Sequence, residues 1–221
     1  RVIAKYTVGV DEIDVEDATE LGILVTHAPT EANWGGVVES TVTMLLTILK
    51  KTRERDNYLK DGKGWRDDAL TGTYLGSRRD GNIGITIGIV GMGRIGKQVA
   101  KRLKGFDTKT IYYDVVDIPQ EVQEELNVQP VELDELLRES DIVTLHVPLT
   151  RRTRGMISDR ELEMMKPDAF LVNCCRGPVV DEAALHRALS QHKIAAAGLD
   201  VLEVEPTPVD NPLFDLDNVV I

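Results

Sequence analysis

Short apolar runs alternate with amphipathic stretches over most of this chain, and the alternation predicts its fold class. From residue 83 onwards, strand-like runs are separated by segments in which apolar side chains recur every three or four positions. This order of elements is typical of a parallel sheet with helices on both faces. We therefore predict a doubly wound α/β domain. Its strands are expected at residues 85–90, 110–113, 142–147, 170–174 and 194–199.

The first 29 residues carry a smaller pattern of the same kind. Residues 2–6 and 23–27 are strand-like, and a short helical stretch, residues 14–21, lies between them. A single βαβ unit cannot bury both faces of its own sheet. We therefore expect it to belong to a small domain whose other strands lie outside these residues, which would make the chain a fragment.

A long helix is predicted after this unit. Between Val38 and Leu49, apolar side chains recur at intervals of three and four, which predicts a helix from residue 37 to about residue 59. Residues 61–80 contain many glycines and show no periodicity, which favours an extended arm. Trp65 in this arm is a candidate interface anchor.

Composition and charge exclude several classes of partner. Acidic side chains outnumber basic ones, 37 to 26, and the net charge of −11 disfavours nucleic acid and anionic membrane surfaces. The basic cluster at residues 50–55 is interleaved with acids and is typical of a solvated helix face. With 221 residues, the chain has room for one large α/β domain, or for a medium domain and part of a second.

The two cysteines, Cys174 and Cys175, are neighbours in the sequence. A bridge between adjacent residues is strained, so we expect no disulfide and favour a reducing, cytoplasmic setting. No apolar run approaches the roughly twenty residues that span a bilayer, and no signal peptide is recognisable. No metal site is predicted.

A glycine-rich turn is the strongest candidate for a binding site. Gly91, Gly93 and Gly96 follow an apolar strand and open a helix. In dinucleotide-binding folds the first glycine permits the turn, the second lets the backbone approach a pyrophosphate, and the third lets helix and strand pack closely. The alternative is a glycine-rich turn in some other kind of α/β protein.

Asp114 favours the dinucleotide interpretation. It ends the next apolar strand, eighteen residues after Gly96, where a carboxylate accepts hydrogen bonds from the adenosine ribose hydroxyls. A 2′-phosphate at this place would meet like charge. The sequence therefore favours NAD over NADP.

Polar residues also follow the later strands, where ligands of open parallel sheets bind. His146 and Pro148 end one strand, Cys174 to Arg176 the next, and Asp200 the last. This repetition predicts that one cleft is lined from several strand ends.

Three of the polar residues allow more than one interpretation. His146 is interpreted as a hydrogen-bonded histidine that shapes a loop rather than as a proton donor. Arg176 either forms a structural ion pair or binds a carboxylate or a polarised carbonyl. Glu205 would be an ordinary loop carboxylate without a histidine partner, and none of His27, His146, His186 and His192 is well placed for that role.

Five segments, in their order and spacing, resemble the D-isomer-specific 2-hydroxyacid dehydrogenases, which include phosphoglycerate dehydrogenase: GMGRIG, YYD, HVPLT, VNCCRG and GLDVLEVEP. The resemblance covers nearly the whole chain. It implies an NAD-binding Rossmann domain over residues 30–221 and a fragment of a flavodoxin-like substrate-binding domain over residues 1–29. It also implies a homodimer, with the long helix and the arm as candidate interface.

The resemblance implies roles for individual residues. The substrate carboxylate would lie against the backbone of Val8 and Gly9 and against Arg176. NAD would contact Gly91, Gly93, Arg94, Ile95, Gly96, Asp114, His146, Pro148, Thr153, Cys174, Cys175, Arg176 and Asp200.

The implied reaction is hydride transfer between NAD(H) and a small D-2-hydroxy acid or 2-oxo acid. Arg176 would bind the carboxylate and polarise the carbonyl, and Glu205 would orient a histidine that exchanges the proton. In this family that histidine follows the last strand, so it is expected just beyond Ile221. The related formate dehydrogenases carry glutamine where Glu205 stands, so a carboxylate here favours oxo-acid chemistry.

Two alternatives and one departure remain. The chain could be an NADH-sensing, corepressor-like binding protein of the same fold, or a bare cofactor-binding module. The segment TEANWGGVVES, which contains Trp34, differs from the family's usual sequence at the start of the long helix. An altered hinge or substrate mouth at this point leaves the identity of the acid open.

Overall fold

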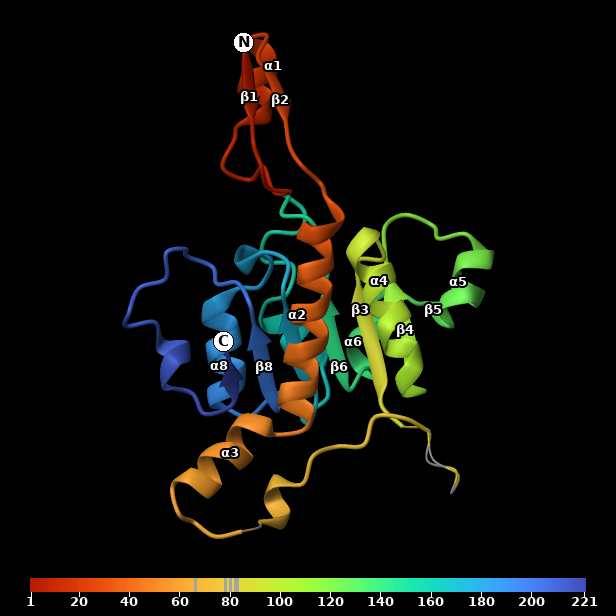
Figure 1. Cartoon of the computed structure of the whole chain (residues 1–221), viewed down its shortest axis with the longest axis vertical. Coiled ribbons are helices and arrows are strands. Elements are labelled where there is room, and N and C mark those ends of the chain that lie inside the picture. The colour runs from red at the N-terminus through yellow and green to blue at the C-terminus, as the bar shows by residue number, and fades with distance from the viewer. Residues whose placement is uncertain (66, 78, 80, 82–83) are drawn as a thin grey trace.

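A computed structural model describes residues 1–65, 67–77, 79, 81 and 84–221 of the chain. Within these ranges seven strands form one parallel sheet in the order β5-β4-β3-β6-β7-β8-β9 (Figure 1). The predicted doubly wound sheet is confirmed, with the two short edge strands β5 and β9 added to it. The strands are β3 (Thr86–Val90), β4 (Lys109–Tyr113), β5 (Val128–Pro130), β6 (Ile142–Leu145), β7 (Phe170–Asn173), β8 (Ala196–Leu199) and β9 (Val219–Val220).

The direction of winding reverses between β3 and β6. These two strands are neighbours, yet β4 and β5 extend the sheet on one side and β7, β8 and β9 extend it on the other. At such a switch point the loops after the two central strands separate and open a crevice at their carboxyl ends. The glycine-rich turn follows β3 and His146 follows β6, so both lie at this crevice.

Helices cover both faces of the sheet and enclose two apolar cores. Every residue of the central strand β3 is buried, as expected for a parallel strand covered on both sides. One face carries α2 (Glu31–Leu49), α4 (Arg94–Leu103) and α5 (Gln120–Leu126), and the other carries α6 (Leu133–Glu139), α7 (Asp159–Met164) and α8 (Glu182–Ser190). Short 3₁₀ turns lie at η1 (Asp68–Leu70), η2 (Lys104–Phe106), η3 (Gly177–Val179) and η4 (Pro212–Asp215).

The prediction of one helix over residues 37–59 is wrong at its start and in its continuity. Helix α2 begins six residues earlier, at Glu31, and ends at Leu49, and a second helix, α3, covers Thr52–Lys60. The break lies at Lys51, whose φ of 49° is left-handed. The arm packs against this break in the helix. A Cβ on Gly72 would lie only 2.8 Å from the Cα of Lys50.

The N-terminal residues form the expected βαβ unit, with β1 (Val2–Ala4), α1 (Val15–Glu20) and β2 (Leu24–Thr26). Strands β1 and β2 are parallel and form a sheet of their own. The unit stands beyond the start of α2, at the end of the molecule opposite α3 (Figure 1). All three residues of β1 are exposed, so this small sheet has little cover within the described chain.

The arm runs along the opposite end of the molecule, below α2 (Figure 1). Its described part is irregular apart from η1, as predicted, and Trp65 is exposed. Residues 66, 78, 80 and 82–83 lie outside the described residues, and with them the predicted start of the Rossmann core at residue 83.

None of the helices in the described ranges is long and apolar enough to cross a membrane.

Candidate cofactor and substrate site

The three glycines of the turn have three different environments. Gly91 has a left-handed φ of +97°, and a Cβ on it would lie 2.6 Å from the carbonyl oxygen of His146. A Cβ on Gly96 would lie 2.1 Å from the carbonyl oxygen of Gly91, so this glycine lets α4 approach the turn. A Cβ on Gly93 would have no atom within 4 Å. The fold therefore requires Gly91 and Gly96, whereas the space in front of Gly93 is open to a ligand.

Helix α4 presents its N-terminus to that open space. Gly93 is its N-cap residue and has no side chain, so no side chain caps the amides of the first turn. Such amides, together with the helix dipole, form an anion site. Arg94 is exposed on this first turn and adds a positive charge. The arrangement fits a pyrophosphate.

Asp114 lies beside the glycine turn. Its Oδ2 accepts a hydrogen bond of 2.6 Å from the backbone N–H of Met92, and its Oδ1 accepts one of 2.9 Å from Val116. The carboxylate is partly exposed, so it can accept further hydrogen bonds. Its position between the turn and the end of β4 is the position expected of the ribose-binding acid.

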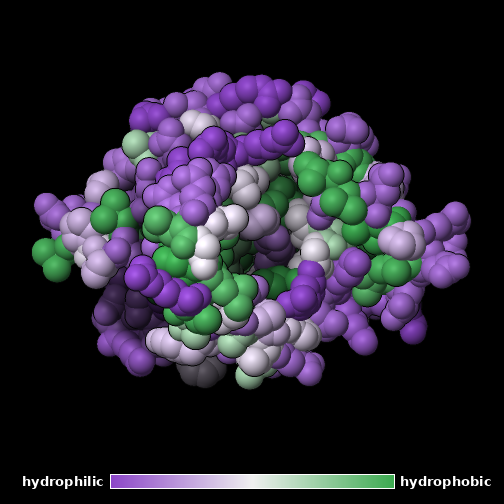
Figure 2. All heavy atoms as spheres, turned by 90° about the horizontal axis from the view of Figure 1, so that it is seen from above, coloured by the Kyte–Doolittle hydropathy of each residue, from purple (hydrophilic) through white to green (hydrophobic). Residues whose placement is uncertain are grey.

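A cavity of about 320 Å³ lies at the carboxyl ends of the strands. Seen from this end of the molecule, the surface is hollowed, with hydrophobic residues among those that border the hollow (Figure 2). Segments from far apart in the sequence meet around the cavity, including the N-terminal loop and the start of α2. It brings together eight of the predicted site residues: Val8, Gly9, Ile95, His146, Pro148, Cys174, Cys175 and Arg176.

His146 is buried and neutral. Its Nε2 lies 3.0 Å from the hydroxyl of Thr144, and its Nδ1 is buried without a hydrogen-bond partner in the described residues. Burial lowers the pKa of His146 to about 3. A histidine with such a pKa carries no charge near neutral pH and is a poor general acid there. That His146 shapes a loop rather than transfers a proton stays a prediction; in the described residues one of its two ring nitrogens is paired.

The two cysteines contribute shape and not reactivity. Both thiols are free and buried, and Cys175 Sγ donates a hydrogen bond of 3.1 Å to Asn173 Oδ1. Burial raises the pKa of Cys174 to about 11 and also raises the pKa of Cys175. Because the thiolate is the nucleophilic form, neither residue is suited to covalent catalysis.

Arg176 follows β7 and makes an ion pair, one of the two interpretations that the sequence allowed, with a partner that the sequence did not identify. Its Nε donates a hydrogen bond of 2.6 Å to Asp11 Oδ2, and its Nη1 donates one of 2.6 Å to the carbonyl oxygen of Cys175. Asp11 lies in the same N-terminal loop as Val8 and Gly9. In the sequence, the one indication that Asp11 belongs to the site was its position close to Val8 and Gly9, whose backbone is predicted to bind the substrate carboxylate.

A second cavity, of about 440 Å³, lies on the other side of Arg176 and brings Glu205 into the site. Gly9, Asp11 and Arg176 line both cavities. Glu205 is exposed, and its Oε1 accepts a hydrogen bond of 3.0 Å from the backbone N–H of Leu202. The two residues named as catalytic therefore share one cavity.

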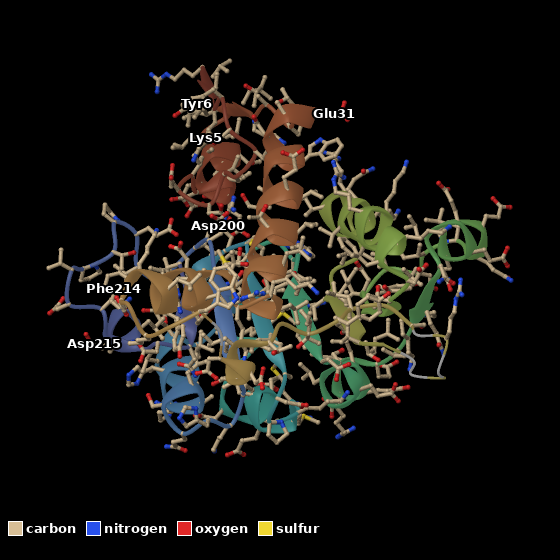
Figure 3. All side chains as sticks on the ribbon, turned by 60° about the horizontal axis from the view of Figure 1, so that its bottom comes forward. Lys5, Tyr6, Glu31, Asp200, Phe214 and Asp215 are labelled. Carbon is tan, nitrogen blue, oxygen red and sulfur yellow. The ribbon has the colours of Figure 1, made fainter. Side chains whose placement is uncertain are left out.

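Asp200 follows β8 at the same edge of the sheet. Partial burial of its carboxyl raises the pKa of Asp200, and repulsion by Glu205 raises it further. Figure 3 labels Asp200 between the N-terminal unit, marked by Lys5, and the body of the domain. Asp200 lines neither of the two cavities.

The Thr153 side chain forms hydrogen bonds within its own loop. Its hydroxyl donates a hydrogen bond of 2.6 Å to the carbonyl oxygen of Pro148 and accepts one of 2.8 Å from the backbone N–H of Thr150. These bonds close the loop that carries Pro148 to the cavity. Thr153 itself is not among the residues that line it.

Trp34 is a wall residue that the sequence analysis did not assign to the site. It lines the 320 Å³ cavity together with Asn33 and Val37, because α2 begins at Glu31 rather than at residue 37. Asn33 Nδ2 donates a hydrogen bond of 3.0 Å to the carbonyl oxygen of Ala28, which holds the start of the helix in place. The available signal was the departure of this segment from the family's usual sequence.

Comparison with known proteins gives one consistent result. A family model described as "D-isomer specific 2-hydroxyacid dehydrogenase, NAD binding domain" matches residues 42–221. A glyoxylate reductase of Korarchaeum cryptofilum is 44% identical over 100% of this chain and 65% of its own length. A D-3-phosphoglycerate dehydrogenase of Methanocaldococcus jannaschii is 45% identical over 100% of this chain and 40% of its own length.

Among solved structures, D-lactate dehydrogenase from Aquifex aeolicus, complexed with NAD and lactic acid, superposes with a TM-score of 0.89. It is 35% identical, and the match covers 100% of this chain and 68% of that one. The chain therefore spans about two thirds of the glyoxylate reductase and less than half of the phosphoglycerate dehydrogenase.

Proposed function

This chain belongs to the D-isomer specific 2-hydroxyacid dehydrogenase family, and we propose that its protein interconverts a small D-2-hydroxy acid and the corresponding 2-oxo acid with NAD(H). The observation that carries the proposal is the convergence of Arg176, Glu205 and the loop of Val8 and Gly9 at the crevice beside the glycine turn. The relatives reported above are named as enzymes, and nothing in the comparisons supports the corepressor-like alternative.

The cofactor half of the site fits NAD, and the matched family model is an NAD-binding domain. The N-terminus of α4, with Gly93 and Arg94, would hold the pyrophosphate, and Ile95 would lie beneath the dinucleotide. Asp114 would accept hydrogen bonds from the adenosine ribose. When bound, NAD(H) accepts or supplies the hydride. The residues of this chain would hold and orient it.

The substrate half of the site is suited to an α-oxo carboxylate. The Arg176 guanidinium offers donors to the carboxylate and the carbonyl oxygen, and it would stabilise negative charge that develops on that oxygen. The amides of the loop at Val8 and Gly9 would hold the carboxylate from the other side. The apolar walls, including Trp34, restrict the size of the acid.

The proton requires a further group. Among the residues that line the two cavities, His146 is the one histidine, and its lowered pKa makes it unsuited to this task. Glu205 would instead orient the histidine that the family resemblance implies after residue 221, and its charge would favour the protonated imidazole.

We further propose that residues 1–29 are part of a flavodoxin-like substrate-binding domain and that residues 30–221 form the NAD-binding domain.

The test of this function is reductase activity of the full-length protein on a panel of 2-oxo acids, including glyoxylate and pyruvate, with NADH. Arg176→Ala should lower kcat/KM about 1000-fold, because the site loses the donors that stabilise the developing charge. Arg151→Ala is the matched control, since this arginine side chain is 95% exposed and makes one loose contact with Glu16. Absence of turnover on every acid would overturn the proposal.

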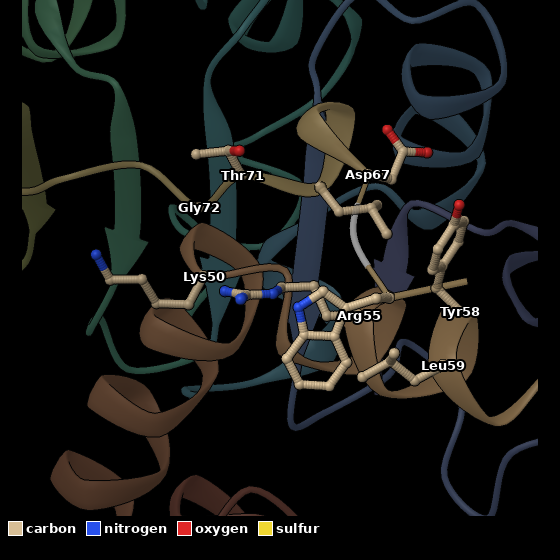
Figure 4. A pocket seen from close by; sticks show the side chains of 9 residues that line it. Lys50, Arg55, Tyr58, Leu59, Asp67, Thr71 and Gly72 are labelled. Atoms are coloured by element: carbon tan, nitrogen blue, oxygen red, sulfur yellow. The ribbon is translucent and has the colours of Figure 1, made fainter. Parts of the chain in front are cut away.

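We also propose a homodimer formed through α3 and the arm. A cavity of about 500 Å³ opens between them, with Tyr58, Leu59 and Trp65 among its walls (Figure 4). Trp65 is 87% exposed, and a side chain of this kind is a typical interface anchor. Trp65→Glu should shift the protein to monomer in sedimentation. Val209→Glu, on an apolar residue that is 96% exposed and lies outside α3 and the arm, should not.

A cytoplasmic location is the last part of the proposal. It is supported by the two free, buried thiols of Cys174 and Cys175, which persist in a reducing compartment. Cell fractionation with the tagged full-length protein tests it. Recovery in a secreted or membrane fraction would contradict it.

A further inference from the structure

We propose that Asp11 is a positioning residue that sets the orientation of the Arg176 guanidinium for the substrate. This inference rests on the proposed function, because it concerns the same arginine. The two residues are 165 positions apart in the sequence and meet at 2.6 Å between Nε and Oδ2. Their contact joins the N-terminal loop to the end of β7.

The contacts of Arg176 fix the plane of its guanidinium. Nε is held by Asp11, and Nη1 is held by the carbonyl oxygen of Cys175 at 2.6 Å. A planar group that is held at two of its three nitrogens cannot rotate about its long axis. Nη2, which neither of these bonds holds, lies against Gly9, in the loop that would hold the substrate carboxylate.

Gly9 supports the same geometry. A Cβ at this position would lie 2.0 Å from Arg176 Nη2 and 2.8 Å from Asp11 Oδ2. Its φ is outside the left-handed range, so space rather than backbone conformation calls for glycine here. Gly9 therefore lets the guanidinium and the Asp11 carboxylate come together against the loop.

Arg176 pairs with Asp11 and not with the other acids that line the 440 Å³ cavity. Three other carboxylates line it, and in the described residues each has a different partner. Glu12 pairs with Lys5, Glu203 accepts a hydrogen bond of 3.1 Å from the backbone N–H of Glu182, and Glu205 accepts one from Leu202. Without Asp11, the guanidinium of Arg176 would be free to turn toward these acids. One of them is Glu205, whose proposed role is to orient the histidine that exchanges the proton.

Stability is a poor explanation for the pair. The side chains of Arg176 and Asp11 are 39% and 35% exposed. Ion pairs with this degree of exposure contribute little to the free energy of folding because water screens them. Orientation of a group in the site is the contribution that remains, and a small misplacement of a reacting group reduces a rate strongly.

The test compares Asp11→Ala with Asp11→Asn in the full-length protein. The measurements are kcat and KM for glyoxylate, the affinity of the unreactive analogue oxamate in the presence of NADH, the affinity of NADH, and the melting temperature. Asp11→Ala should lower kcat about 30-fold and weaken oxamate binding, with NADH affinity and melting temperature unchanged. Asp11→Asn keeps an oxygen that accepts from Nε, so it should recover kcat to within about threefold of the wild type. Glu16→Ala, which removes another acid of the N-terminal unit, is the control and should match the wild type.

Two results would overturn the positioning role. Tighter oxamate binding in both Asp11 variants would mean that Asp11 competes with the substrate for Arg176. Wild-type kcat and oxamate affinity in Asp11→Ala would mean that the arginine is held without it. If the wild-type protein reduces no 2-oxo acid, the proposed function fails by that result alone, while the response of oxamate binding to Asp11→Ala still decides the role of Asp11.

Discussion

The two halves of the site are built in different ways. The cofactor half is local: Gly91, Gly93 and Gly96 lie within six residues, and Asp114 follows at the end of the next strand. The substrate half is assembled from the N-terminal loop, the start of α2 and the ends of β6 and β7, and its central contact joins residues 165 positions apart. The first half depends on backbone shape, and the second depends on side chains held by distant partners. Each prediction below tests one side of this difference, in order of decreasing expected effect.

The largest effect is expected from two substitutions within the same turn. Gly96→Ala should lower the free energy of unfolding by about 3 kcal/mol, because its Cβ would meet the backbone of Gly91 at 2.1 Å. Gly93→Ala should leave unfolding unchanged, since its Cβ has open space, but should weaken NADH binding about tenfold. Urea unfolding and calorimetric titration with NADH measure the two. Equal loss of stability in both variants would show that the turn has no separate ligand space.

The next effect concerns the buried His146. Its pKa in the folded protein is about 3, below the ordinary value of 6.5, so the unfolded chain binds a proton between these pH values and the folded chain does not. The stability is therefore complete above about pH 6.5 and falls as the pH drops toward 3, by up to about 1.4 kcal/mol per pH unit. Urea unfolding at pH 7 and pH 5 should differ by about 2 kcal/mol more in the wild type than in His146→Gln. An identical pH dependence in the two proteins would contradict a buried neutral histidine.

A smaller effect is expected at Asp114. Asp114→Ala removes the acceptor for the N–H groups of Met92 and Val116 as well as the proposed ribose contact. NADH affinity should fall about tenfold, or about 1.4 kcal/mol, and the preference for NADH over NADPH should shrink. Asp117→Ala, on an exposed acid in the same loop, is the control. Tighter binding of NADPH than NADH by the wild type would overturn the proposed role of Asp114.

The smallest effect is expected at Trp34. Trp34→Ala opens the wall of the 320 Å³ cavity, so larger 2-oxo acids should gain severalfold in kcat/KM relative to glyoxylate. NADH affinity should change little. The measurement is the ratio of kcat/KM for phenylpyruvate and glyoxylate in variant and wild type. An unchanged ratio would place the limit on substrate size at another wall.

The glycine turn, the parallel sheet and the predicted strands follow from short-range patterns. Apolar runs of strand length, and glycines at positions where a Cβ would meet backbone, act within a few residues of one another. The prediction of the long helix failed where tertiary contact intervened. The arm packs against Lys50, where α2 ends, and the start of the helix at Glu31, next to the hydrogen bond of Asn33 to Ala28, follows from no periodicity of apolar side chains.

What the sequence by itself determined is thus the fold class, the glycine turn and the kinds of residue that end each strand, because these depend on local sterics and on the periodicity of apolar side chains. The tertiary structure alone decided that Asp11 is the partner of Arg176, that Trp34 forms a wall of the cavity, and that His146 is neutral. Each of these depends on which distant side chains share a small volume and how much water reaches them. No spacing along the chain encodes such distances, so they become visible only when the chain is folded.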